Sequence, residues 1–245
     1  MVYNLLIMKN KIIAWLKQQV KAAGAKGIVL GLSGGIDSCV VAALAKEAVG
    51  KNKVLGLILP IHSQAQDFAD ANLIARKLGI KVKVVNLTAT YDNLLKVLPA
   101  ASELVQINLK PRLRMATLYY FANGLNYLVC GTGNKAELKL GYFTKFGDGG
   151  ADILPLGDLL KRQVRELAGE LKIPGRIIAK PPTAGLWPGQ TDEGEMGITY
   201  SELDDILGRI ENRQPQRAEN KKVEKVKKMV QRSEHKRQGP RICYI

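Results

Sequence analysis

"GIVLGLSGGIDSCVVAALAKEAV" spans residues 27–49 and joins a short apolar run to a longer one through the adjacent glycines Gly34 and Gly35. Residues 27–32 are apolar and partly β-branched, which predicts a buried strand. Residues 37–49 carry apolar side chains at helical spacing, which predicts a helix that starts near Asp37. The stretch therefore predicts a strand, a glycine turn and a helix in direct succession.

The same alternation continues along the chain. Apolar runs at 53–60, 81–87 and 126–132 predict further buried strands. Between them, residues 65–79 and 110–125 have helical spacing, and Gly79 is a plausible helix cap. Strands that alternate with helices form right-handed crossovers. We therefore expect an α/β fold with an open, doubly wound parallel sheet, helices on both of its faces, and ligands at the carboxyl ends of the strands.

The chain changes character beyond residue 140. A glycine-rich stretch leads to a predicted helix over about 158–171, which Pro174 and Gly175 end. Residues 180–197 are rich in Pro and Gly and predict a long, functional or mobile loop. Two last helices, over about 200–211 and 216–231, predict a helical C-terminal extension. We expect residues 1–245 to form a single domain that includes this loop and the basic tail at 213–245.

Composition narrows the classes of protein to consider. The sequence has no run of eighteen apolar residues, so we expect neither a membrane span nor a membrane partner. Its N-terminal stretch has no small-residue cleavage site, which argues against a signal peptide. Cys39, Cys130 and Cys243 have no CxxC spacing, which argues against a disulfide framework or a zinc site. These features predict a protein of the reducing cytoplasm.

The formal net charge is +15, and most of the excess lies near the C-terminus. Residues 213–241 contain eleven Lys or Arg against three Glu, so this tail holds more than half of the excess. Such a run is either a solvated helix face or a flexible segment that brings cations to an anionic substrate. The second interpretation explains the charge without a nucleic-acid partner, and we expect none.

The turn at residues 33–38 is suited to an anion. Backbone N–H groups and the helix dipole meet at one place, and glycines allow phosphate to approach the backbone closely. Ser33 and Ser38 add hydroxyl donors, whereas Asp37 would repel phosphate unless a cation such as Mg²⁺ lay between them. The turn lacks the lysine of GxxxxGK[ST], so it is a phosphate loop of another type. The alternative is an ordinary turn in which Ser and Asp cap a helix.

"SGGIDS" resembles the pyrophosphate loop of the N-type ATP pyrophosphatases. Among these, the chain resembles the NAD synthetase family over about residues 31–238, in its ammonia-dependent form without a glutaminase domain. Six further segments carry the resemblance, in the order of the family: "NLKPRLRM" (108–115), "GTGNKAE" (131–137), "GYFTKFGDGGADILPL" (141–156), "KRQVREL" (161–167), "KPPTAGLWPGQTDEGEMGITYSELDDIL" (180–207) and "SEHKRQ" (233–238).

The resemblance implies a ligase with the fold of the adenine nucleotide α-hydrolases. ATP and ammonia would convert deamido-NAD to NAD, AMP and pyrophosphate through an acyl-adenylate, the final step of NAD biosynthesis. It implies the catalytic residues Asp37, Glu137 and Lys161, with Asp37 and Glu137 holding Mg²⁺. It implies that ATP is bound by Gly31, Leu32, Ser33, Gly34, Gly35, Ile36, Asp37, Ser38, Thr132, Lys161 and Thr183. It implies that deamido-NAD is bound by Arg112, Lys145, Asp152, His235 and Lys236.

Two other functions stay open at this point. One is a tRNA-modifying, thiolating enzyme with the same loop, although the scattered cysteines fit its chemistry badly. The other is a non-catalytic ATP-binding sensor, which would need neither a second carboxylate at Glu137 nor the long loop at 180–197 and the basic tail. The resemblance also implies a homodimer, and the apolar region 93–125 could supply the helices of its interface.

Overall fold

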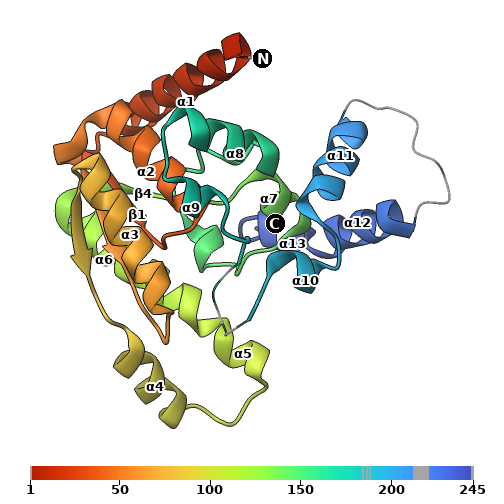
Figure 1. Ribbon diagram of the computed structural model, residues 1–245. Helices are drawn as coiled ribbons and strands as arrows, with labels where there is room; N and C mark the ends of the chain where they lie inside the picture. The colour runs from red at the N-terminus through yellow and green to blue at the C-terminus, as the bar shows by residue number, and fades with distance from the viewer. Residues whose placement is uncertain (1, 184, 186, 188, 212–220, 244–245) are drawn as a thin grey trace.

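Four parallel strands form the sheet at the centre of the molecule, in the order β3-β2-β1-β4 (Figure 1). They are β1 (Gly27–Gly31), β2 (Val54–Ile58), β3 (Lys81–Val84) and β4 (Tyr127–Cys130). The computed structural model describes residues 2–183, 185, 187, 189–211 and 221–243. The strand order reverses direction between β1 and β4, so the expected doubly wound α/β sheet is confirmed.

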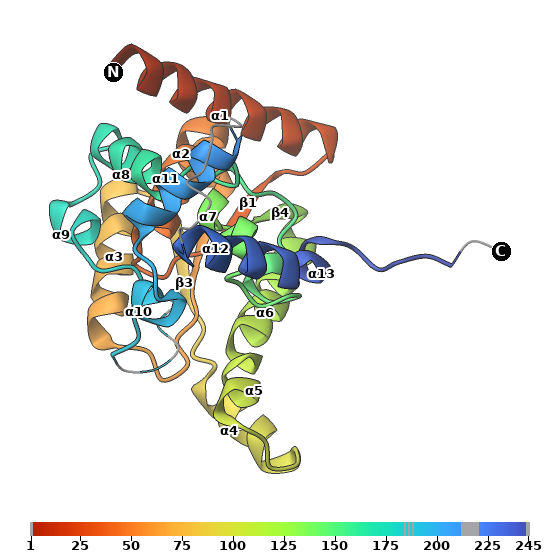
Figure 2. The ribbon, with the colours of Figure 1, turned by 90° about the vertical axis from the view of Figure 1, so that its right-hand side faces the viewer.

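Alternate residues of β1 contact two different hydrophobic clusters, one on each face of the sheet. Ile28 and Leu30 are fully buried in the first cluster and Val29 in the second. The first cluster lies under α1 (Val2–Ala22), α2 (Ile36–Val49), α3 (Ala65–Leu78), α8 (Lys161–Glu170) and α9 (Gly175–Ile178). The second lies under α4 (Thr88–Val97) and α6 (Leu109–Leu125), with the short α5 (Glu103–Ile107) packed on α6. Figure 2 shows α4 and α5 projecting below the sheet.

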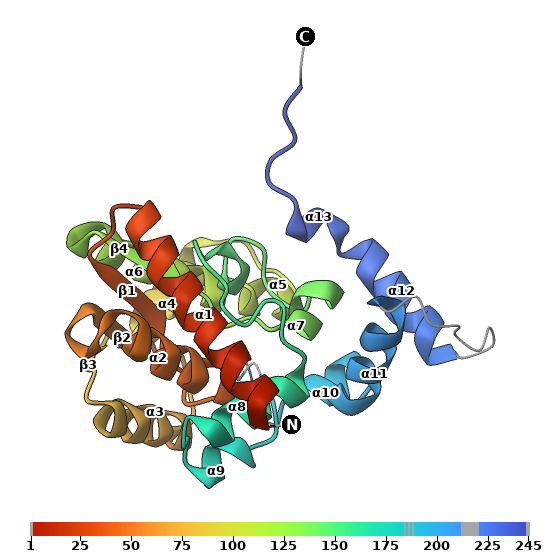
Figure 3. The same ribbon diagram turned by 90° about the horizontal axis from the view of Figure 1, so that it is seen from above.

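A third hydrophobic cluster lies away from the sheet and forms the core of the helical extension. It joins α7 (Lys135–Leu140), α10 (Asp192–Met196), α11 (Tyr200–Glu211) and α12 (Lys221–Arg232), and α13 (Glu234–Arg237) follows α12. Figure 3 shows the chain after α13 leaving the body of the molecule. Two short 3₁₀ turns, η1 (Lys51–Lys53) and η2 (Asp148–Gly150), complete the elements. None of the described helices is long and apolar enough to cross a membrane.

The structure corrects the predicted strand at 81–87. It is shorter, and its side chains are mostly exposed rather than buried, because β3 is an edge strand. The lysines at positions 81 and 83 place charge on this edge strand, which disfavours its pairing with a strand of another chain. Burial depends on the order of the strands, which the apolar pattern of one segment does not contain.

Two predictions for the second half of the chain are also wrong in part. The helix predicted over 158–171 starts only at Lys161, because Leu160 is extended and its N–H donates to Gln163 Oε1 at 2.9 Å. The predicted loop at 180–197 ends in α10, whose first turn is capped by the Thr191 hydroxyl. The last helix is described from Lys221, and the predicted start at 216 lies outside the described residues.

Candidate active site

The loops after β1 and β4 flank the point where the strand order reverses, and both line one cavity of about 590 Å³. Open α/β sheets bind ligands at this point. Of the residues expected to bind ATP, the structure places the following in the cavity wall: Gly31, Leu32, Ser33, Gly35, Ile36, Asp37, Ser38, Thr132, Lys161 and Thr183. Glu137, which is expected to hold a metal ion, lines the same cavity. Gly34 instead packs against α3.

The serine–glycine loop (residues 33–38) is held by its own hydroxyl groups. Ser38 Oγ donates to the Gly35 carbonyl at 2.9 Å and lies 3.1 Å from Ser33 Oγ, and Gly35 N–H donates to Ser33 Oγ at 3.2 Å. Gly34 has a φ of 81°, in the left-handed region that favours glycine. A Cβ on Gly34 would lie 2.5 Å from the Asp67 carbonyl oxygen, so α3 also excludes a side chain here. These contacts define the shape of the loop.

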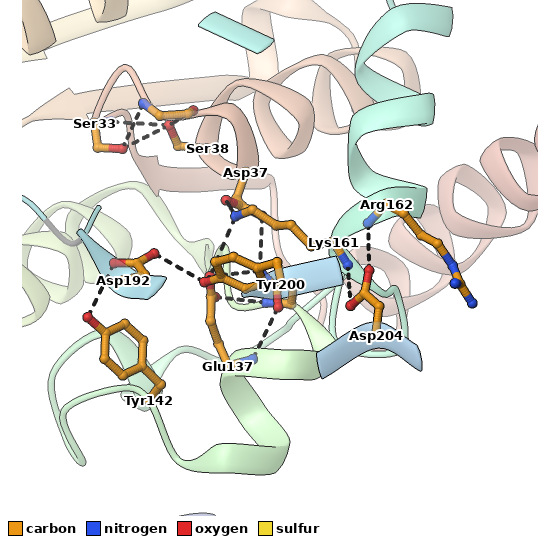
Figure 4. A network of polar contacts seen from close by, with 12 residues as sticks. Ser33, Asp37, Ser38, Glu137, Tyr142, Lys161, Arg162, Asp192, Tyr200 and Asp204 are labelled. Carbon is orange, nitrogen blue, oxygen red and sulfur yellow. Dashed lines mark hydrogen bonds and ion pairs between the residues drawn. The ribbon is translucent and has the colours of Figure 1, made fainter. Parts of the chain in front are cut away.

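Lys161 lies between two carboxylates beside this loop (Figure 4). Its Nζ is 2.6 Å from Asp37 Oδ2 and 3.8 Å from Glu137 Oε1, and its side chain is only 2% exposed. Asn134 joins the same carboxylates, because its amide nitrogen donates to Asp37 Oδ1 at 3.2 Å and to Glu137 Oε1 at 2.7 Å. Asn134 and Glu137 also form a capping box at the start of α7. Helix capping thus fixes Glu137 toward Asp37.

The pKa values in this group follow from burial and from the neighbouring charges. Desolvation, helped by the charge of Asp37, raises the pKa of Glu137 to about 8, although Lys161 acts in the opposite direction. Desolvation also opposes the charged form of Lys161, but Asp37 and Glu137 outweigh it and the pKa of Lys161 is raised. Lys161 therefore stays charged, and Glu137 is the group that takes up a proton.

Asp37 and Glu137 fit a metal ion that also takes oxygens from a substrate. Their side chains are 17% and 18% exposed, and both line the cavity. Within the described ranges, no group of three or more His, Cys, Asp or Glu side chains could hold a metal ion by itself. Mg²⁺ commonly combines one or two carboxylates with substrate phosphate oxygens. The pair suits such an ion.

Helix α11 supports this group from behind, and sequence reasoning missed both residues that do so. Tyr200 and Asp204, one turn apart on α11, are each 1% exposed. The Tyr200 ring lies 4.9 Å from Lys161 Nζ, and its hydroxyl is 3.3 Å from Glu137 Oε1 and 3.1 Å from Asp192 Oδ2. Asp204 accepts hydrogen bonds from the backbone N–H groups of Lys161, at 3.2 Å, and Arg162, at 2.9 Å. The i, i+4 spacing of these residues was the only signal in the sequence.

Asp204→Ala should weaken catalysis because it removes the cap that sets the first residue of α8. We expect a loss of about 1–2 kcal/mol of stability and a fall in kcat of about tenfold, as Lys161 moves relative to Asp37. Asp205→Ala is the matched control, since Asp205 is exposed and pairs with Arg162 on the surface. Thermal unfolding and steady-state kinetics of both variants provide the measurement. Equal kcat values for the two variants would contradict the prediction.

Most of the residues expected to hold deamido-NAD lie outside the cavity wall, and Lys145 among them contacts the C-terminal tail. Arg112 on α6 donates to the Lys145 carbonyl at 3.3 Å, and Lys145 Nζ donates to the carbonyls of His235, at 2.6 Å, and Gln238, at 3.0 Å. Lys236 alone of the five lines the cavity. Asp152 stands apart, where it accepts hydrogen bonds from the hydroxyl of Tyr119 and the N–H of Val129, each at 2.7 Å. The structure thus brings Arg112, Lys145 and the His235–Lys236 segment close together. Asp152 lies apart from them, between β4 and α6.

The tail is docked on the C-terminal end of α7 by main-chain contacts. Lys236 Nζ donates to the carbonyls of Gly141, at 2.8 Å, and Phe143, at 3.0 Å. Arg237 donates to the carbonyls of Leu138, at 3.3 Å, and Lys139, at 2.8 Å. Cations favour the carbonyl end of a helix. His235 is exposed on the same short helix, with Nδ1 3.0 Å from the Arg232 carbonyl oxygen.

Comparison with known proteins gives the same family by a family model and by individual relatives. The NAD synthase family matches residues 8–240. A protein described as NH(3)-dependent NAD(+) synthetase from Carboxydothermus hydrogenoformans is 48% identical, over 95% of each chain, and one from Archaeoglobus fulgidus is 46% identical, over 96% of each.

Solved structures agree with the sequence comparison. The NMN synthetase of Francisella tularensis is 40% identical with a TM-score of 0.91, over 98% of this chain and 99% of that one. The NH3-dependent NAD synthetase of Campylobacter jejuni is 28% identical with a TM-score of 0.85, again over 98% and 99%. With a match that covers nearly its whole length, the chain belongs to the NAD synthase family.

Proposed function

We propose that this protein is an ammonia-dependent NAD synthetase, a ligase that uses ATP to convert deamido-NAD and ammonia to NAD, AMP and pyrophosphate. The observation that carries the proposal is Lys161, held between Asp37 and Glu137 beside the serine–glycine loop. Family membership favours this reaction over the tRNA-modifying and sensor hypotheses.

The proposed chemistry activates a poor electrophile. The nicotinate carboxylate attacks the α-phosphorus of ATP, and the bond to the β-phosphate oxygen breaks. Ammonia then attacks the carbonyl carbon of the acyl-adenylate, AMP leaves, and one proton is released. The protein positions the reactants and neutralises their charge, which accounts for much of the catalysis in such reactions.

Each side chain has a defined part in the proposal. The serine–glycine loop binds the departing pyrophosphate through its N–H and hydroxyl groups, and Lys161 offsets the charge that develops there. Thr132 and Thr183 contact the nucleotide. Asp37 and Glu137 would hold Mg²⁺, which would supply positive charge to neutralise the phosphates. Because Lys161 already offsets one carboxylate, the site can accept an ATP–Mg²⁺ unit without leaving a buried charge unpaired.

The substrate side of the proposal rests on the cluster that Arg112 and Lys145 form with the tail. These cations, with His235 and Lys236, suit the pyrophosphate of deamido-NAD, and the Asp152 carboxylate suits its ribose hydroxyls. We propose that the loop and tail belong to the same domain as the sheet, because α12 and α13 pack on α7.

The purified protein tests the function directly. We expect NAD and AMP to form one-for-one from ATP, Mg²⁺, deamido-NAD and ammonium, and much more slowly when glutamine replaces ammonium. Nicotinate mononucleotide should be tested in parallel, since a solved relative is described as an NMN synthetase. A higher kcat/KM for the mononucleotide would correct the substrate, and no amide product from either nucleotide would reject the function.

We also propose that the protein is a homodimer. Large apolar side chains are exposed on the neighbouring helices α4, α5 and α6: Val97 is 77% exposed, Leu104 62%, Val105 57% and Tyr120 76%. A patch of this kind on neighbouring helices is typical of a surface that another chain covers. A second copy is the expected occupant, because Tyr120 lies on α6, the helix that also carries Arg112.

A substitution in this patch should separate the subunits. Sedimentation velocity should give a dimer for the wild type and mainly monomer for Tyr120→Asp, because a carboxylate would be buried without a partner. Lys46→Asp, on the opposite side of the sheet, is a control that should remain dimeric. A wild type that is monomeric at micromolar concentrations would contradict the prediction.

A further inference from the structure

A second group of ion pairs lies on the α3 side of the cavity, apart from Lys161. Lys180 Nζ is 2.6 Å from Asp67 Oδ1 and 3.2 Å from Asp70 Oδ2. Asp70 Oδ1 also forms an ion pair with Arg176, at 2.9 Å, and accepts a hydrogen bond from Gln66, at 3.0 Å. The Asp70 side chain is 3% exposed, whereas Lys180 and Asp67 are about one-fifth exposed and line the cavity. Two cations thus face two carboxylates.

The same turn of α3 supports the serine–glycine loop. A Cβ on Gly34 would lie 2.5 Å from the Asp67 carbonyl oxygen and 3.0 Å from Asp70 Cβ, so the loop backbone rests directly on these two residues. Neither contact leaves room for the loop to shift toward α3, because packed protein interiors do not deform continuously. Any displacement of this turn of α3 would therefore move the loop.

Lys180 also begins the segment that carries Thr183. Pro181 and Pro182 follow it, and prolines restrict the backbone of this short connection. At the far end, the Pro182 carbonyl accepts a hydrogen bond from Asp192 N–H at 3.1 Å. The Lys180 ion pairs are therefore the contact that ties the start of this segment to α3.

We propose that Lys180 and Asp67 are positioning residues that hold the Thr183 segment in register with the serine–glycine loop, so that both meet the phosphates of one ATP molecule. The inference rests on the proposed function, in which this loop binds ATP. Charge favours positioning over direct phosphate binding: Lys180 and Arg176 are balanced by Asp67 and Asp70, which leaves no net positive charge for a phosphate.

The test compares Lys180→Met, Asp67→Asn and the double variant with the wild type. We expect Lys180→Met to raise the KM for ATP about tenfold, with the KM for deamido-NAD unchanged, because only the ATP side loses its alignment. Asp67→Asn should act in the same direction, and the double variant should be no worse than Lys180→Met, because the two residues act as one pair. Lys180→Arg should restore most of the lost affinity.

Arg176→Met is the matched control. Arg176 binds the same Asp70 from the surface, where it is 54% exposed, and it does not line the cavity. A merely structural cluster would lower the unfolding temperature in both Arg176→Met and Lys180→Met and leave the KM for ATP unchanged in both. That outcome would overturn the proposal.

Direct phosphate binding by Lys180 predicts a different pattern. Asp67→Asn would then remove one of the two carboxylates that hold the ammonium group and lower the KM for ATP, and Lys180→Met would remain harmful in the Asp67→Asn background. Either result would overturn the positioning role. If Lys180→Met does not fold, as judged by circular dichroism, Lys180→Arg and Asp67→Asn carry the same comparison.

The design separates this inference from the proposed function. If the wild type makes NAD and Lys180→Met has an unchanged KM for ATP, the inference about Lys180 is rejected and the proposed function stands. A wild type that makes no amide product rejects the function, and equilibrium binding of a non-hydrolysable ATP analogue with Mg²⁺ then tests the inference on the same variants. Weakened binding in Lys180→Met, but not in Arg176→Met, would support it.

Discussion

Lys161→Met is expected to lower kcat for NAD formation about a thousandfold, the scale seen when a preorganised electrostatic contact is removed from an active site. The Nζ of Lys161 lies 2.6 Å from Asp37 and 3.8 Å from Glu137 in a place that is almost closed to solvent. Methionine fills a similar volume but leaves two carboxylates facing each other. Activity is measured with saturating ATP, Mg²⁺, deamido-NAD and ammonium, below the unfolding temperature of the variant.

The same substitution should also reduce stability. Removal of one partner from a buried ion pair costs about 3–5 kcal/mol, and protonation of Glu137 will offset part of it. Arg162→Met is the control, because Arg162 is the next residue of α8 but is 54% exposed and pairs with Asp205 at the surface. We expect its kcat within about twofold of the wild type. A Lys161→Met variant with more than a tenth of wild-type activity would show that Lys161 is not catalytic.

Glu137→Gln is expected to lower kcat about a hundredfold and to change how stability depends on pH. The kinetic effect arises because an amide keeps the shape of the side chain but cannot offset the charge of a metal ion. Asn134 and Tyr200 would also meet an NH₂ group at one of the two oxygen positions they now contact.

The effect on pH dependence has a defined sign. Burial raises the pKa of Glu137 in the folded protein from its usual 4.5 to about 8. Between these values the unfolded chain binds fewer protons than the folded one, so stability falls as pH rises. The contribution of Glu137 to the free energy of unfolding is complete below about pH 4.5 and is lost as the pH rises through about 8.

Thermal unfolding at pH 6 to 9, without Mg²⁺ or nucleotide, measures this effect. The unfolding temperature of the wild type should decline across the range, and the decline should be shallower in Glu137→Gln. Glu224→Gln removes an exposed carboxylate that pairs with Lys227, so it should keep the wild-type slope. Identical slopes for all three proteins would refute the assignment of this titration to Glu137.

The unit formed by β1, the serine–glycine loop and α2 is predictable because its signals are local. The apolar run, the adjacent glycines and the helical spacing lie within 23 residues, and the structure places the ends of β1 and α2 within about one residue of the expected ones. Asp37 and Glu137 meet for a reason that is also general: the carboxyl ends of adjacent parallel strands lie at the same edge of the sheet.

The support behind Lys161 could not be predicted in the same way. Asp204 lies 43 residues from Lys161 along the chain, and Tyr200 lies 63 from Glu137. Both are ordinary residues of an amphipathic helix until that helix is docked. The first two N–H groups of α8 are likewise capped by Asp204 from another helix, which the local sequence around residue 158 does not show.

The docking of the tail on α7 has a consequence for how this protein can change during evolution. Lys145, Lys236 and Arg237 donate to carbonyl oxygens that any amino acid would supply, at positions 138, 139, 141, 143, 235 and 238. Lys139, at the exposed end of α7, contributes its carbonyl rather than its side chain to these hydrogen bonds, so substitutions there should leave them in place. Gly141 is the exception, because any side chain there would collide with Ser233. A saturation library scored for growth should accept most substitutions at 139 and almost none at 141.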